Sequence, residues 1–236
     1  MGRAFEFRRE RKEKRWDKMA KTFTKYGKLI AMAVKAGGSE IENNAKLRVI
    51  IQNAKGENMP KDRIENAIAR ASSKDADSFS EVVYEGYGPY GIGILVECAT
   101  DNPTRTVANV RMYFNRNNGE LGKTGSLDFA FTRRGVFRVS PGEHKIEDLE
   151  FSLIDFGLEE IYEDEGNYVI LTAFQDFGLM QKGLEEFKIE LIKAESQRIP
   201  NTTTKLTPEQ EDEILDLVDK FEQDDDVSAV YHTMGN

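Results

Sequence analysis

The sequence predicts an α+β protein of three domains, in which an N-terminal helical domain precedes two ferredoxin-like α/β domains, one inserted in the other. Apolar residues follow the 3.6-residue period of helices as far as residue 72, and they follow the alternation of strands from Phe79 onwards. A later block has the order strand–helix–strand–strand–helix–strand, which is typical of a ferredoxin-like domain. The predicted domains are residues 1–74, residues 79–133 with 205–236, and the inserted residues 134–204.

Three helices are expected in the first domain. At 100° per residue, the segment 14–35 places its apolar residues on one side, and Gly37 and Gly38 supply its end. A second helix fits residues 42–55, and a third begins at Pro60, because proline is favoured at the first helical position. The apolar side of the first helix comprises Trp16, Met19, Ala20, Phe23, Ile30 and Val34.

The second domain begins with a predicted hairpin. Strands at residues 82–84 and 92–96 flank a glycine-rich turn, and Asn102 then caps a helix that ends near Gly119. The alternating apolar residues of the next expected strand are Leu127, Phe129 and Phe131.

The inserted domain and the last helix and strand complete the prediction. Thr207 and Gln210 form a capping box that opens a helix, and a last strand covers residues 227–232. Since this helix and strand have no partners of their own, we expect them to return to the sheet that begins at Val82. In the inserted domain, strands are expected at 136–139, 158–162, 168–173 and 191–196, with helices at 146–153 and 177–187.

Charge is divided unequally along the chain. The whole chain has a formal net charge of −9, yet residues 1–74 carry 19 Lys/Arg against 9 Asp/Glu, a net charge of +10. The remaining residues carry 14 against 33, a net charge of −19. A molecule polarised in this way suits a polyanionic partner that the basic end contacts and the acidic part repels.

The basic residues concentrate between Arg3 and Lys35, where twelve Lys/Arg stand against four Asp/Glu. On the expected helix the lysines form a stripe opposite the apolar side, and the residues before it form a separate basic arm. A solvated helix back is the alternative interpretation, because most charged helix faces are of that kind. The expected nucleic-acid contacts are Arg8, Arg9, Arg11, Lys12, Lys14, Arg15, Lys18, Lys21, Lys25 and Lys28.

A second candidate site lies at residues 100–106. Unpaired N–H groups at the start of the expected helix, together with Thr104 and Arg105, could donate to a phosphate. In the alternative interpretation, Asn102 and Thr104 cap the helix while Arg105 pairs with Glu97 or Asp101.

The sequence does not favour an enzyme. His144 and His232 lie far apart and have no metal-ligand spacing, and Cys98 sits in an apolar run typical of a buried residue. Residues 86–91 have the letters of a dinucleotide-binding loop, but a strand follows them instead of a helix. The acidic run 224–226 lacks the glycine and distal Glu of a calcium loop, so we expect a solvated turn. No catalytic residue, cofactor or metal is predicted.

No apolar run is long enough to span a membrane, and no apolar segment of a secretory signal is present. We therefore expect no membrane partner and a cytoplasmic location.

Several short motifs stand close together in the second domain. They are YEGYGP at 84–89, VEC at 96–98, TDN at 100–102 with Arg105 and Thr106, NGELG at 118–122, and GS at 125–126. These motifs resemble the YebC/PmpR family of probable transcriptional regulatory proteins, and the resemblance extends over essentially the whole chain. One departure is the start, where many members read Gly-His-Ser-Lys-Trp and this chain reads GRAFEF, so no role of that His or Lys carries over.

The resemblance implies three domains and a cytoplasmic DNA-binding regulator of transcription. Similar mitochondrial proteins are regarded as translational activators, and some bacterial relatives help ribosomes through proline-rich stretches. DNA and ribosomal RNA therefore stay open as partners of the basic domain, with a protein partner on the acidic α/β domains. An enzyme or small-molecule sensor that uses the cleft between the α/β domains is the third class considered.

Overall fold

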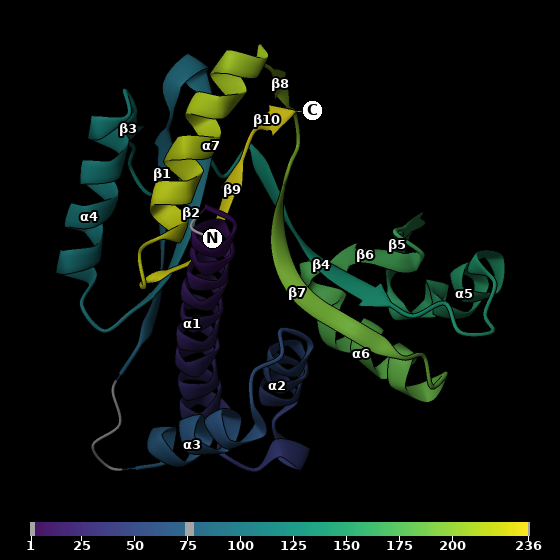
Figure 1. Ribbon diagram of the computed structural model, residues 1–236. Coiled ribbons are helices and arrows are strands. Elements are labelled where there is room, and N and C mark those ends of the chain that lie inside the picture. Colours follow the sequence, from purple (N-terminus) through teal and green to yellow (C-terminus); the bar gives the residue numbers. More distant parts are fainter. Residues whose placement is uncertain (1–2, 74–77, 236) are drawn as a thin grey trace. The chain divides into compact units, whose positions relative to one another are not determined.

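The computed structural model describes residues 3–73 and 78–235, with the backbone alone described for residues 3–18. These residues combine helices with antiparallel sheets and divide into two compact units (Figure 1). The first unit comprises the chain up to Ser126 and again from Thr204, and the second comprises Leu127–Thr203. The α+β class is therefore confirmed, whereas the division into three domains at the expected boundaries stays a prediction.

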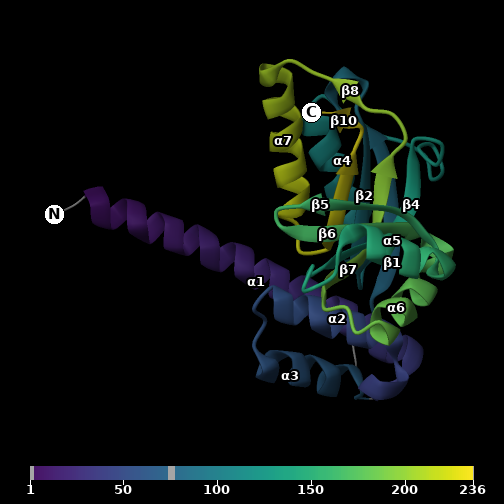
Figure 2. The same ribbon diagram turned by 90° about the vertical axis from the view of Figure 1, so that its right-hand side faces the viewer.

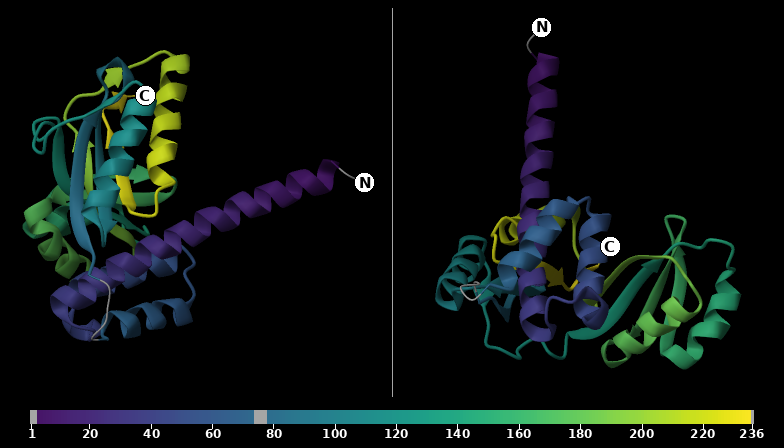
Figure 3. Two further views of the ribbon diagram at one scale, coloured as in Figure 1. Left: turned by 90° about the vertical axis from the view of Figure 1, so that its left-hand side faces the viewer. Right: turned by 90° about the horizontal axis from the view of Figure 1, so that it is seen from below.

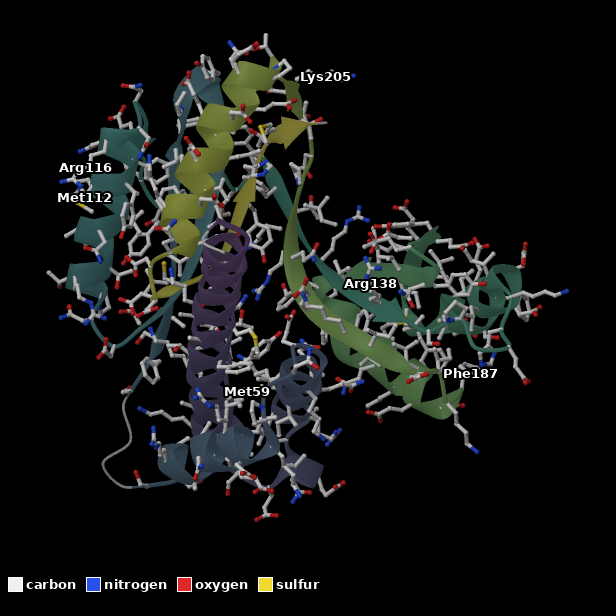
Figure 4. All side chains as sticks on the ribbon, viewed as in Figure 1. Met59, Met112, Arg116, Arg138, Phe187 and Lys205 are labelled. Atoms are coloured by element: carbon white, nitrogen blue, oxygen red, sulfur yellow. The ribbon has the colours of Figure 1, made fainter. Side chains whose placement is uncertain are left out.

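Three helices, α1 (Arg3–Gly37), α2 (Ala45–Gly56) and α3 (Lys61–Ala71), begin the first unit. A 3₁₀ turn, η1 (Ile41–Asn43), precedes α2. Asn44 joins α1 to α2, because its side chain accepts from the Leu47 N–H at 3.0 Å and donates to the Ala33 carbonyl at 2.9 Å. Met59, labelled in Figure 4, is buried in the core that these helices share. Other members of this core are Tyr26, Ile30, Val34, Leu47, Ile50, Ile51, Ala54 and Ile64.

The helix boundaries differ from the expected ones in two places. The first helix begins at Arg3 and not at residue 14, because the Glu, Lys and Arg residues before it are strong helix formers. The third helix begins at Lys61, one residue after the expected Pro60. Pro60 is the N-cap residue, and its backbone is extended.

The first unit also contains a four-stranded antiparallel sheet in the order β3-β1-β2-β9. The hairpin of β1 (Ser80–Tyr87) and β2 (Gly93–Thr100) is confirmed, with the 3₁₀ turn η2 (Pro89–Gly91) at its tip. β9 (Val227–His232) pairs with β2, so the expected return of the last strand to this sheet is confirmed. The remaining strands are β3 (Glu120–Leu121), and β8 (Thr204–Lys205) paired in parallel with β10 (Met234–Gly235).

Two helices, α4 (Pro103–Arg116) and α7 (Pro208–Glu222), cover the same face of this sheet (Figure 2). Phe114 of α4 and Phe221 of α7 meet edge to face, with ring centroids 4.9 Å apart. Gly86 of β1 permits this packing, because a Cβ there would lie 2.7 Å from the Phe114 ring and 2.5 Å from the Glu120 carbonyl oxygen. The predicted capping box of Thr207 and Gln210 is confirmed at the start of α7.

The second unit has the predicted ferredoxin-like order, with an antiparallel sheet arranged β5-β6-β4-β7. Phe137 of the inner strand β4 packs on Phe177 of helix α6, with ring centroids 4.6 Å apart. Gly183 leaves room for the ring of Phe156, which comes within 2.5 Å of the position a Cβ would take. Its elements are β4 (Phe131–Val139), α5 (Ile146–Leu153), η3 (Ile154–Phe156), β5 (Leu158–Asp164), β6 (Asn167–Ala173), η4 (Phe174–Asp176), α6 (Phe177–Glu186) and β7 (Leu191–Pro200).

The strand expected at residues 127–131 is wrong. Turns occupy residues 124–130, and the strand that follows, β4, begins only at Phe131 and continues to Val139. Leu127 is buried while Phe129 is 75% exposed, so their alternation reflects two sides of a turn. Gly125, at φ +83°, supports this path because its backbone is in the left-handed region.

Among the described residues, no helix combines the length and apolar character needed to cross a membrane.

Candidate nucleic-acid interface

The basic helix α1 is anchored by one apolar side. Ile30 and Val34 are buried in the helical core, as the spacing predicts, and Phe23 packs against that core with Arg63 above its ring at 5.5 Å. Ala20, which was expected on the same side, is exposed. Tyr26 is buried instead, because the side of α1 that packs on α2 and α3 is centred closer to Tyr26.

The expected contact residues fall into two groups. The side chains of Arg8, Arg9, Arg11, Lys12, Lys14, Arg15 and Lys18, like that of Trp16, lie outside the described residues. Their backbone belongs to α1, which Figure 3 shows as one unbroken helix, so the expected basic arm and lysine stripe share a single element. Lys21 and Lys25 follow on the same helix and are partly exposed. Binding of nucleic acid by these residues stays a prediction.

Lys28 is engaged within the molecule. Its Nζ donates to Asp226 Oδ1 at 2.7 Å, to the Asp225 carbonyl at 2.8 Å and to the Ala99 carbonyl at 3.2 Å. The side chain is 13% exposed, and the Phe79 ring lies 5.6 Å from its Nζ. Sequence analysis placed Lys28 among the phosphate contacts, but these partners come from segments far along the chain that helical spacing does not reveal.

The second carboxylate oxygen of Asp226, Oδ2, accepts several hydrogen bonds. Arg105 Nη2 donates to Oδ2 at 2.8 Å, and the hydroxyls of Thr106 and Thr100 lie 2.8 and 3.1 Å from the same atom. The Asp226 side chain is 5% exposed, so the expectation that the whole run 224–226 is solvated is wrong. We call Asp226, Lys28, Arg105, Thr100 and Thr106 the Asp226 cluster.

The surroundings of Asp226 favour its ionised form. Burial alone raises the pKa of a carboxyl group, because it disfavours the charge. Here the hydrogen bonds from Lys28, Arg105 and Thr106 outweigh burial and hold the pKa of Asp226 well below its usual range. The pKa of Arg105 is raised, mainly by its hydrogen bond with Asp226 and next by its hydrogen bond with Asp101. The cluster therefore contains a charged carboxylate at neutral pH.

The second candidate site is a capped helix start. The Asn102 side chain accepts from the Arg105 N–H at 3.1 Å, and Arg105 Nη2 also bonds Asp101 at 2.8 Å, as the capping interpretation predicts. Thr104 is exposed and its side chain does not cap α4. A phosphate contact by Thr104 and Arg105 stays a prediction, and a phosphate would compete there with two carboxylates.

The acidic turn between α7 and β9 has a role that the sequence pattern did not indicate. Asp224 accepts from the Asn109 amide at 3.0 Å and from the Tyr113 hydroxyl at 3.2 Å, so it fastens this turn to α4. One usable signal was the position of Asp226, directly before an apolar strand and therefore at the edge of the core. In the described part of the chain, no group of three or more His, Cys, Asp or Glu residues could hold a metal ion.

Two family models match almost the entire chain. The model described as "TACO1/YebC protein N-terminal domain" matches residues 3–74, and "TACO1/YebC second and third domain" matches residues 79–234. The chain belongs to the TACO1/YebC family. This membership confirms the resemblance that the motifs indicated.

Similar proteins of the TACO1/YebC family match this chain over most of their own length. A "probable transcriptional regulatory protein" of Cytophaga hutchinsonii is 60% identical over 99% of this chain and 98% of its own. One of the same name from Parabacteroides distasonis is 54% identical over 99% of this chain and 97% of its own. The crystal structure of a conserved hypothetical protein of Aquifex aeolicus has a TM-score of 0.79 and 32% identity, and the match covers 92% of this chain and 90% of that one.

Proposed function

We propose that this protein is a cytoplasmic, non-enzymatic regulator of transcription that binds DNA through its basic N-terminal helices. The net charge of +10 over residues 1–74, in a chain whose net charge is −9, is the observation that carries the proposal. The names of the relatives, probable transcriptional regulatory proteins, support regulation of transcription. A basic surface of this kind attracts the phosphate backbone and steers association.

Neutralisation of phosphates by α1 is the proposed mode of binding. The proposed contacts are the expected Lys and Arg residues between positions 8 and 25. Lys28 is not among them, because its ammonium group is held by Asp226. Six phosphate contacts would release enough counterions to give a log–log dependence of affinity on salt of about −5. Because phosphates are alike at every base pair, such contacts position the protein without reading sequence.

The acidic α/β domains have the complementary role of receiving a protein partner. Their carboxylates repel nucleic acid, and α5 and the following turn η3 each expose one large apolar side chain next to acidic residues. Phe151 is 83% exposed and Ile154 is 62% exposed. Exposed apolar side chains of this size are typical of contact sites.

A mobility-shift titration on duplex DNA at two salt concentrations tests the DNA proposal. We expect binding at low salt, weaker binding at high salt, and loss of the shift when Lys14, Lys18, Lys21 and Lys25 are changed to Glu. A control variant with the same charge change uses the exposed Lys123, Lys145, Lys182 and Lys205, and it should reduce the shift much less. Absence of binding at low salt, or equal loss in both variants, would overturn the proposal.

A translation factor that grips ribosomal RNA is the second candidate. The expected contacts are Lys and Arg throughout, with no Asn or Gln placed for base edges, and phosphate contact alone suits RNA as well as DNA. Sedimentation through a sucrose gradient separates the two candidates. Co-migration with ribosomal particles, lost in the variant with Glu at the four α1 lysines, would favour translation, whereas migration at the top of the gradient would favour DNA.

A further inference from the structure

We infer that Asp226 is a positioning residue, which holds the basic helix α1 against the C-terminal end of β2 and the turn before β9, so that α1 meets nucleic acid in one orientation. This inference rests on the proposed function, because nucleic-acid binding is the activity that the orientation would serve. Asp226 is suited to this role by its place in the chain. It lies 198 residues from Lys28 and 121 residues from Arg105, and it contacts both.

Lys28 has no N–H left to offer a phosphate. A lysine ammonium group has three N–H donors. Asp226 Oδ1, the Asp225 carbonyl and the Ala99 carbonyl are three acceptors, at 2.7, 2.8 and 3.2 Å. Its three donors are therefore matched by acceptors from β2 and the turn before β9. Lys28 fixes α1 in place, and the proposed phosphate contacts are the basic residues that precede it on α1.

The two oxygens of Asp226 serve different elements. Oδ1 accepts from Lys28 of α1, whereas Oδ2 accepts from Arg105 at the start of α4 and from the Thr106 hydroxyl. The carboxylate thereby ties α1 to α4. An asparagine at this position has one oxygen and one NH₂ group, so its NH₂ would face donors from one of the two helices. Asp226→Asn therefore breaks one side of the tie while keeping the size of the side chain.

Lys28→Met is the milder way to break the same tie. It removes the ammonium group but keeps an unbranched apolar side chain, and it leaves Asp226 with Arg105 and both threonine hydroxyls. Lys35→Met is the matched control, since Lys35 is an exposed lysine of α1 that donates to the Ser78 hydroxyl at 2.6 Å. Circular dichroism and thermal melting establish that each variant folds.

Hydrogen exchange of the free protein tests the positioning directly. Breaking the tie should let the middle of α1 open more often, so we expect amides of residues 21–31 to exchange at least about threefold faster in Asp226→Asn and in Lys28→Met. Adding Asp226→Asn to Lys28→Met should change the exchange of α1 little further, because the ammonium group through which Asp226 holds α1 is already absent. Unchanged exchange of α1 in both variants, or exchange raised equally in Lys35→Met, would overturn the inference.

Binding of a fluorescent DNA duplex, measured by anisotropy over a range of salt, tests the consequence for function. A positioning role predicts that Asp226→Asn and Lys28→Met both weaken affinity at least about threefold and leave the log–log salt slope unchanged. If Lys28 instead contacted phosphate, Lys28→Met would reduce the slope by about 0.9 and Asp226→Asn would strengthen binding. That pattern would overturn the inference. Failure of the unaltered protein to bind duplex would overturn the proposed function, while faster exchange of α1 would still show that Asp226 holds the helix.

Discussion

Burial determines the chemistry of Cys98 in the first unit. Cys98 is 2% exposed in β2, and burial, followed by the nearby charges of Asp224 and Asp226, raises its pKa to about 12. The reactive form of cysteine is the thiolate. Cys98 is therefore an inert core residue, as its place in an apolar run predicts.

Iodoacetamide labelling at pH 8 tests this account of Cys98. We expect no labelling of the folded protein over a time in which free cysteine reacts completely, because the thiol is both buried and protonated. In denaturant, labelling should become complete. Mass spectrometry measures the extent of labelling in both conditions. Rapid labelling under native conditions would contradict the burial of β2.

The stability that Asp226 provides should fall in acid. Its pKa is lower in the folded protein than the usual value of about 3.9, so its contribution is fully present above that value and is lost as the pH falls below it. The other charged groups near Asp226, namely Lys28, Arg105, Asp101 and Asp224, are the same in both proteins compared. We expect the difference in free energy of unfolding between the unaltered protein and Asp226→Asn to be constant from pH 7 to 5 and to shrink below about pH 4. Urea unfolding measures it, and a difference that is constant down to pH 3 would contradict the assignment.

At the scale of elements, local signals were sufficient for most of the fold. The Asn102 cap and the capping box of Thr207 and Gln210 are satisfied by neighbours within a few residues, and the sequence therefore reveals them. The ferredoxin-like order was similarly readable from strand and helix periodicity. The strand expected at residues 127–131 was wrong for residues 127–130, because a turn can also alternate apolar and polar residues. The contact between Lys28 and Asp226 could not be predicted, because it joins segments 198 residues apart.

Asn102→Ala should destabilise the protein through the start of α4. Loss of the hydrogen bond that the Arg105 N–H donates to Asn102 Oδ1 leaves a backbone donor unpaired, and we expect a cost of about 1 kcal/mol. Asn115→Ala, an exposed change within the same helix, is the control and should alter stability by at most about 0.5 kcal/mol. Equal effects of the two changes in denaturant unfolding would show that the cap does not stabilise α4.

At the scale of the whole molecule, opposite charges are placed in different parts of the chain. Residues 1–74 carry a net charge of +10 and the remainder a net charge of −19. The structure modifies this division where Asp226, near the end of the chain, neutralises Lys28. The candidate contact surface is therefore the part of α1 before Lys28. Its charge could be predicted from composition, but the withdrawal of Lys28 from it could not.

The central claim is that α1 neutralises phosphates, and the salt dependence of duplex affinity measures this most directly. Lys14, Lys18, Lys21 and Lys25 are changed to Gln in one variant, and Lys123, Lys145, Lys182 and Lys205 in the other. We predict that the log–log slope of affinity against salt becomes shallower by up to about 3.6 in the first variant, at 0.9 per phosphate contact, and stays unchanged in the second. An equal slope in the unaltered protein and the first variant would contradict the claim.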